Sequence, residues 1–207
     1  MPYETKNFER LLGTPGFSDA LLKNHFSLYQ GYVTNLNKSI ETLNGMLKEG
    51  KGSLPEFAEL KRRFGWEFNG MRLHEFYFGN MRKDKMEMNR DSALARKIKE
   101  DFGSYENWEK DFKATGSMRG IGWAALYYDG PGDRLWNVWI NEHDAGHLAG
   151  TGLIMIMDVF EHAFMIDYGV KKPDYIAALF NALCWNAAEE RFEACMAAYS
   201  QHARRDA

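Results

Sequence analysis

The sequence predicts an α+β protein: an N-terminal antiparallel helical hairpin domain (residues 1–88), then an α/β domain (residues 89–207) with a three-stranded antiparallel sheet. Three observations support this. Apolar residues recur at helical spacing over the first 80 residues, helical spacing returns at both ends of the second half, and three short aromatic or β-branched runs lie between. With 207 residues, 45% of them hydrophobic, the chain is long enough to bury a large core.

A long first helix is predicted after Ser18 and Asp19, whose short polar side chains suit a helix N-cap. Its apolar stripe consists of Leu22, His25, Phe26, Tyr29, Tyr32, Val33, Leu36, Ile40 and Leu43. Gly50 to Ser53 interrupt the pattern, and Pro55 suits the first turn of a second helix that extends to about residue 81. Two long helices joined by a short break favour a hairpin.

The second half changes character after a charged, aperiodic stretch at 83–91, where we place the domain junction. Helices are expected at 92–102 and 104–115, and strands at 122–128, 134–140 and 153–157. A last helix is expected from Pro173 to about Tyr199. Cys184 and Cys195 would lie too far apart along this helix to form a disulfide, so we expect free thiols and a reducing compartment.

Charge and composition narrow the class of partner. A formal net charge of −3 argues against a nucleic-acid-binding surface. The N-terminus lacks an apolar signal core, and no segment reaches 18 consecutive apolar residues. We therefore expect a cytoplasmic protein that binds small molecules or copies of itself, with neither nucleic acid nor membrane as a partner.

The most informative segment is the apolar run at 153–164, because it contains Asp158, Glu161 and His162. An ionised carboxylate in apolar surroundings is costly unless a cation or hydrogen-bond donors compensate it. His25 and His74 also lie among apolar residues. Each histidine taken singly is more often an ordinary core residue. Taken together, three histidines and one aspartate indicate a mononuclear site for iron, manganese or zinc.

A second possible site lies at 142–147, where His143 and His147 are four residues apart and could bind zinc on one helical face, as in a zinc hydrolase. We rank this lower. Gly146, Gly150 and Gly152 indicate a loop at this place, and the order of residues matches the zinc-protease motif only in part. A di-iron carboxylate bundle is disfavoured because its paired Glu-x-x-His motifs are absent.

Four separated segments resemble motifs of the iron/manganese superoxide dismutases, in the same order along the chain. They are HFSLYQGYVTNLNK (25–38), FNGMRLHEFYFGNM (68–81), GIGWAAL (120–126) and DVFEHAF (158–164). The resemblance covers nearly the whole chain. It implies that superoxide is converted to dioxygen and hydrogen peroxide by one iron or manganese ion per subunit, cycling between its +3 and +2 states. It also implies a homodimer or homotetramer, and a metal site between the two domains with His25, His74, Asp158 and His162 as ligands.

The resemblance also assigns roles around the metal. Tyr32 would be the gateway residue that limits access, His143 the hydrogen-bond donor beside the metal, and Trp123 a wall of the cavity. Glu161 would cross a dimer interface to orient His162 of the partner subunit. An alternative on the same fold is a catalytically silent metal-binding protein.

Several positions depart from the family pattern. Only seven positions separate His25 from Tyr32, where the family commonly has eight, so we predict a regular first helix without a bulge. Tyr29 is the nearest substitute for a histidine that the family has near the access funnel. The other differences are Met165 in place of Tyr, Phe160 and Ala125 in place of Trp, and Lys172 in place of an Arg that the family has near the entrance. As a cation, Lys172 could still draw superoxide inward.

Overall fold

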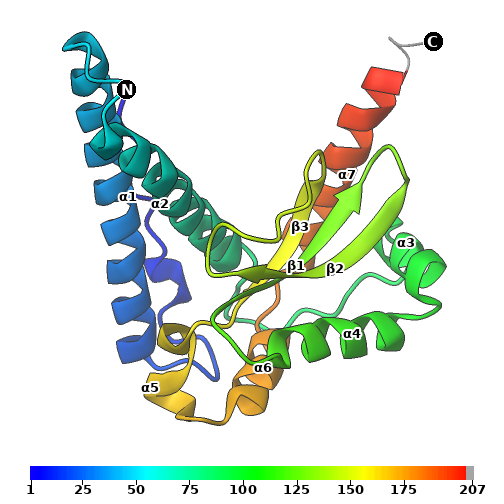
Figure 1. The fold of residues 1–207 in the computed structure, drawn as a ribbon. Coiled ribbons are helices and arrows are strands. Elements are labelled where there is room, and N and C mark those ends of the chain that lie inside the picture. Colours follow the sequence, from blue (N-terminus) through cyan, green and yellow to red (C-terminus); the bar gives the residue numbers. More distant parts are fainter. Residues whose placement is uncertain (204–207) are drawn as a thin grey trace.

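The computed structural model describes the backbone of residues 1–203 and the side chains of residues 1–200. A long hairpin of α1 (Asp19–Lys48) and α2 (Pro55–Gly79) forms one arm of the molecule, and the short helix η1 (Glu9–Leu11) precedes it (Figure 1). The sheet and the remaining helices form the other half, from which α7 (Trp185–Ala203) projects as a second arm. The predicted α+β class is confirmed.

Local sequence explains how the hairpin begins and turns. The hydroxyl of Ser18 accepts a hydrogen bond from the Leu21 backbone N–H at 3.0 Å, which caps α1 as predicted. Pro55 occupies the first turn of α2, where its missing N–H costs nothing. α1 is α-helical without interruption from end to end. The predicted absence of a bulge between His25 and Tyr32 is therefore confirmed.

The sheet has three antiparallel strands in the order β2-β1-β3, namely β1 (Gly122–Asp129), β2 (Arg134–Asn141) and β3 (Gly152–Asp158). The central strand β1 is buried along nearly its whole length. Trp123 near the start of β1 pairs with Asp158 at the end of β3. Directly paired residues project to the same face of a sheet, so this register brings the two side chains together.

The helices of the second half pack against the sheet, α4 on β1 and β2 and α7 on β3. Their bounds are α3 (Ala93–Phe102), α4 (Tyr105–Ser117), η2 (Glu161–Ala163), α5 (Met165–Tyr168) and α6 (Lys172–Asn181). Residues 82–92 form neither helix nor strand, as expected for a connection. The domain boundary after residue 88 stays a prediction. Within the described residues, no helix is both long and apolar enough to cross a membrane.

The prediction of one C-terminal helix from Pro173 to Tyr199 was wrong, because α6 ends at Asn181 and α7 begins at Trp185. Backbone pairing breaks the helix. Leu183 forms an antiparallel bridge with Met81, and the flanking hydrogen bonds are Arg82 N–H to Ala182 C=O at 2.8 Å and Cys184 N–H to Asn80 C=O at 2.7 Å. Cys184 thus precedes α7 whereas Cys195 lies within it; both are free thiols.

Asn80, buried just after α2, joins the two halves of the molecule. Its side-chain amide donates to the Ile156 carbonyl of β3 at 2.9 Å and accepts a hydrogen bond from the Arg191 guanidinium of α7. Arg191 also donates to the Ile154 carbonyl at 3.1 Å. The end of α2 is thereby fixed to the strand that ends in Asp158, which positions His74 opposite this carboxylate.

We predict that Asn80→Ala lowers the free energy of unfolding by about 2–4 kcal/mol, because the Ile156 carbonyl loses its Asn80 donor and the Arg191 guanidinium loses one of its two acceptors inside the protein. Urea denaturation measures this change. Asn107→Ala, which removes one exposed hydrogen bond in α4, is the matched control and should cost less than about 1 kcal/mol. Equal losses in the two variants would contradict the role given to Asn80.

Candidate metal centre

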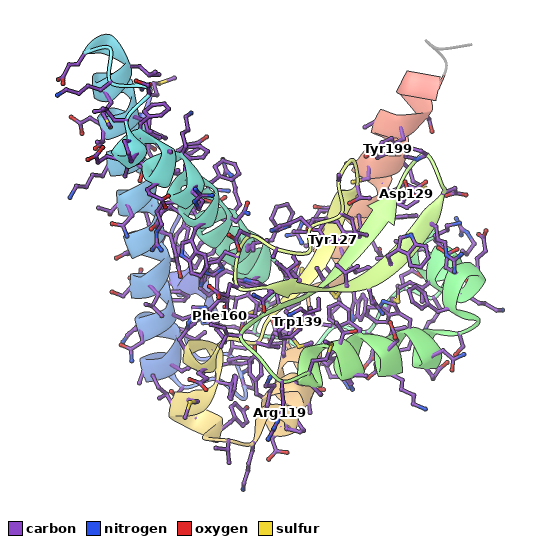
Figure 2. All side chains as sticks on the ribbon, viewed as in Figure 1. Arg119, Tyr127, Asp129, Trp139, Phe160 and Tyr199 are labelled. Carbon is purple, nitrogen blue, oxygen red and sulfur yellow. The ribbon has the colours of Figure 1, made fainter. Side chains whose placement is uncertain are left out.

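Four side chains from four elements converge at the junction of the hairpin and the sheet. His25 comes from α1, His74 from α2, Asp158 from the end of β3 and His162 from η2. One nitrogen or oxygen from each lies within 4.8 Å of every other such atom. Figure 2 shows Phe160, which stacks on His162, at the centre of the molecule where side chains of the two halves meet. The four residues singled out in the sequence thus share one place.

His74 is held in the tautomer that a metal ligand needs. Its Nδ1–H donates to the Gly70 carbonyl one turn earlier, at 2.5 Å. Its Nε2 therefore carries a lone pair, and this atom is buried with no hydrogen-bond partner among the described residues. It lies 3.7 Å from Oδ2 of Asp158. Buried polar atoms are normally paired, so this unpaired nitrogen fits a bound cation.

The Asp158 carboxylate is fully buried and faces the imidazoles through one oxygen. Oδ2 lies 3.1 Å from Nε2 of His25 and 3.2 Å from Nε2 of His162. Oδ1 accepts the Phe160 backbone N–H at 2.8 Å, and the Tyr175 hydroxyl bonds the Asp158 carbonyl at 2.6 Å, so the end of the strand is fixed. Burial opposes ionisation of this carboxyl, but the interactions with His162 and His25 outweigh it and lower its pKa.

Burial favours neutral imidazoles in this cluster. It lowers the pKa of His25 and lowers that of His74 well below the usual value, against the opposing attraction of Asp158. A neutral imidazole offers a lone pair to a metal, whereas a protonated one cannot. Three nitrogens and one carboxylate oxygen are a donor set suited to iron, manganese or zinc. The residues present therefore fit a mononuclear metal ion.

Beside this cluster, Trp123, His143 and Tyr32 form a chain of hydrogen bonds. The indole N–H of Trp123 donates to Nδ1 of His143 at 3.1 Å, so the proton of the neutral imidazole is on Nε2. This Nε2–H donates to the Tyr32 hydroxyl oxygen at 2.7 Å. Burial lowers the pKa of His143 to about 4 and raises that of Tyr32 to about 12. The Tyr32 hydroxyl therefore keeps its own proton, and that proton is not used in the bond to His143.

Two backbone features place Tyr32 and His143. A Cβ on Gly70 would lie 2.4 Å from the Tyr32 ring, so only glycine allows Tyr32 to pack on α2 and stack on His74. His143 lies in a tight turn closed by hydrogen bonds between the backbones of Asn141 and Ala145. The loop that the glycines predicted there is confirmed.

The aromatic wall differs from the expected one. Phe160 replaces the family's Trp yet stacks on both His143 and His162, with ring centroids 4.7 and 5.1 Å away. Trp66 of α2, which is not among the predicted site residues, meets His143 edge-on at 4.8 Å. Its position could have been found from helical spacing, because it lies four residues before Gly70 and eight before His74.

Tyr29 does not replace the funnel histidine. It is fully buried, and its hydroxyl donates to Glu75 at 3.0 Å and accepts the Lys6 backbone N–H at 3.0 Å. These two bonds fasten the N-terminal segment and α1 to α2. Ala125 is a buried residue of β1.

The residues expected at a subunit interface lie on the surface of the chain. Glu161 is exposed, Met165 is 43% exposed, and the His162 side chain between them is 23% exposed. His162, one residue of the cluster, is thus reachable from outside the chain.

Lys172, the cation expected near the entrance, donates to the Met118 carbonyl at 2.9 Å.

The hydrogen bonds of His147 argue against the alternative zinc site. Nε2 of His147 bonds the His143 carbonyl at 2.9 Å, and Nδ1 accepts from the Tyr127 hydroxyl at 2.8 Å. Both nitrogens of His143 are also engaged, by Trp123 and Tyr32. Neither ring offers a free lone pair to a metal.

Comparison with known proteins agrees with this geometry. Residues 90–191 match the family model described as iron/manganese superoxide dismutases, C-terminal domain. The chain is 34% identical to superoxide dismutase [Mn] 2 of Haloferax volcanii, over 93% of each chain. It is also 34% identical to the superoxide dismutase [Fe] of Methanothermobacter marburgensis, over 86% of this chain and 89% of that one. A third relative, the superoxide dismutase [Fe] of Sulfolobus acidocaldarius, is 30% identical over 93% of this chain and 91% of its own.

Identity at this level over nearly the full length of several relatives, together with the matched C-terminal half, identifies the family. The chain belongs to the iron/manganese superoxide dismutases.

Proposed function

We propose that this protein disproportionates superoxide to dioxygen and hydrogen peroxide with one iron or manganese ion per subunit, held by His25, His74, Asp158 and His162. The observation that carries the proposal is the convergence of these four side chains beside a Tyr32 hydroxyl whose proton is available. When bound, the metal supplies one-electron chemistry by alternating between its +3 and +2 states.

The protein supplies the surroundings that this chemistry needs. Peroxide formation consumes protons, and Tyr32 can donate one because His143 binds its oxygen and not its hydrogen. Trp123, Phe160 and Tyr32 surround the imidazoles with aromatic rings. Such a wall favours a substrate as small as superoxide.

Iron and manganese remain equal candidates in this proposal, because both ions accept the same ligands and the relatives include proteins named for each. We also propose a homodimer in which Glu161 bonds His162 of the partner subunit. The support is that Glu161 is exposed next to a histidine whose side chain is partly exposed. A carboxylate that bonds the outer nitrogen of a metal-bound imidazole orients the ring.

The test is to load the purified protein with iron or manganese and follow superoxide decay by stopped-flow absorbance. We expect about one ion per chain and a rate far above that of the same amount of free metal, whereas Asp158→Asn should lower metal affinity by more than about 100-fold. Asp84→Asn is the control, because the Asp84 side chain is 90% exposed. It should change neither metal affinity nor the rate of superoxide decay. A loaded protein that binds one ion without accelerating decay would instead be the silent metal-binding alternative.

Tyr32→Phe removes the proton donor but keeps the ring that stacks on His74. We predict that the turnover number falls by about tenfold at unchanged metal content, a smaller loss than for a sole acid because water can also supply protons. The same change at a distant tyrosine of α4, Tyr105→Phe, should leave turnover intact. If both variants keep wild-type turnover, the role of Tyr32 as a donor is rejected.

Glu161→Gln tests the interface. The variant keeps the size of the side chain but removes the charge. We therefore predict that the dimer dissociation constant, measured by sedimentation velocity over a concentration series, rises about tenfold. Glu41→Gln, an exposed change on α1, is the control. A wild-type protein that is monomeric at all concentrations, or equal dissociation constants for all three proteins, would refute this arrangement.

A further inference from the structure

One face of α2 leads from solvent to the proposed ligand His74. Arg63, Glu67, Gly70 and His74 follow one another at intervals of three or four residues, so their positions lie on one side of the helix. The side chains become progressively buried in this order: Arg63 is 56% exposed, Glu67 3% and His74 0%. The face therefore runs from the surface into the metal centre.

The same face borders the Tyr32–His143 pair. The Tyr32 ring packs against Gly70, and Trp66 meets His143 edge-on at 4.8 Å. Burial raises the pKa of Tyr32 to about 12, the charges of Asp158 and Glu67 add to this rise, and the charge of Arg63 opposes it. Arg63 and Glu67 thus lie close enough to the Tyr32 hydroxyl for their charges to affect its ionisation.

Arg63 and Glu67 form an ion pair in which the Glu67 carboxylate is buried and the Arg63 side chain is largely exposed. Nε of Arg63 donates to Oε1 of Glu67 at 2.7 Å, and the guanidinium lies over the Trp66 ring at 5.2 Å. The second oxygen, Oε2, is buried and has no hydrogen-bond partner within residues 1–200. A buried carboxylate depends on its partner charge, so Arg63 compensates Glu67 and presents its own charge outward.

The surroundings of Arg63 contain other carboxylates. Arg63 lines a shallow depression of about 200 Å³ together with Glu59, Arg62, Trp66 and Asp144. Arg62 pairs with Glu59 at 3.1 Å, and both of these side chains are more than 70% exposed. Asp144 directly follows His143. An anion that approaches here meets repulsion from Asp144 and Glu67 unless a cation offsets it.

We propose that Arg63 is the cation that draws superoxide toward the metal centre along α2, and that Glu67 is the positioning residue that holds it there. This inference rests on the proposed dismutase function. The family resemblance suggested Lys172 as a cation that attracts superoxide. Arg63 would be a second such cation, and it lies on the hairpin.

The test measures anion association with the iron-loaded protein by stopped-flow absorbance, with azide as the probe and superoxide in parallel, at ionic strengths from about 10 to 500 mM. Arg63→Gln should lower both association rate constants about threefold at low ionic strength, with the difference vanishing at high ionic strength. Arg63→Lys keeps the charge and should restore most of the rate. Glu67→Gln keeps an acceptor for Nε but removes the inner negative charge, so association should become about twofold faster.

Arg62→Gln is the matched control, because it makes the same change in net charge one residue away. It should alter association by less than about 1.5-fold. The inference is overturned if Arg62→Gln slows association as much as Arg63→Gln, if the loss persists at high ionic strength, or if Glu67→Gln slows association. A protein that follows the expected order with azide but does not accelerate superoxide decay refutes the proposed function and leaves Arg63 as a residue that attracts anions.

Discussion

The buried charge of Asp158 is the constraint on which the rest of the site depends. Its carboxylate is fully enclosed, and one backbone N–H, that of Phe160, bonds its outer oxygen. Its inner oxygen faces the nitrogens of His25, His74 and His162. Burial favours the neutral form of the first two rings, so they cannot supply a full positive charge. A metal ion would provide the charge compensation that the chain lacks and would use the lone pair that His74 leaves unpaired.

Tertiary structure assembles this cluster from distant segments. Asn80 fixes the end of α2 to β3 and α7, while pairing of Trp123 with Asp158 aligns the central strand with the end of β3. The Trp123 indole also donates a hydrogen bond to His143, and His143 in turn donates one to the Tyr32 hydroxyl of α1. The hairpin and the sheet are therefore linked twice, once through the cluster of His25, His74, Asp158 and His162 and once through the Trp123–His143–Tyr32 chain. A displacement of either half would disturb both links.

Much of the fold and the cluster was predictable because each depends on local pattern. Helical spacing, the Ser18 cap and Pro55 defined the hairpin. The polar groups isolated in apolar sequence at 25, 74, 158 and 162 indicated the cluster that the structure brings together. The break between α6 and α7 was not predictable, because it arises from long-range pairing of Leu183 with Met81. Tyr29 was misplaced for a similar reason: its partners Glu75 and Lys6 come from other segments. Helical spacing places Trp66 on the face of α2 that carries His74, but its contact with His143 depends on the 142–147 loop folding against α2.

The most direct test of the central claim is anomalous diffraction from crystals of the protein loaded with iron or manganese. The account predicts one anomalous peak per chain, at about 2.0–2.3 Å from a nitrogen of each of His25, His74 and His162 and from an oxygen of Asp158. A fully loaded crystal whose peak lies elsewhere, for example beside His147, with Asp158 still bonded to imidazole nitrogens alone, would contradict it.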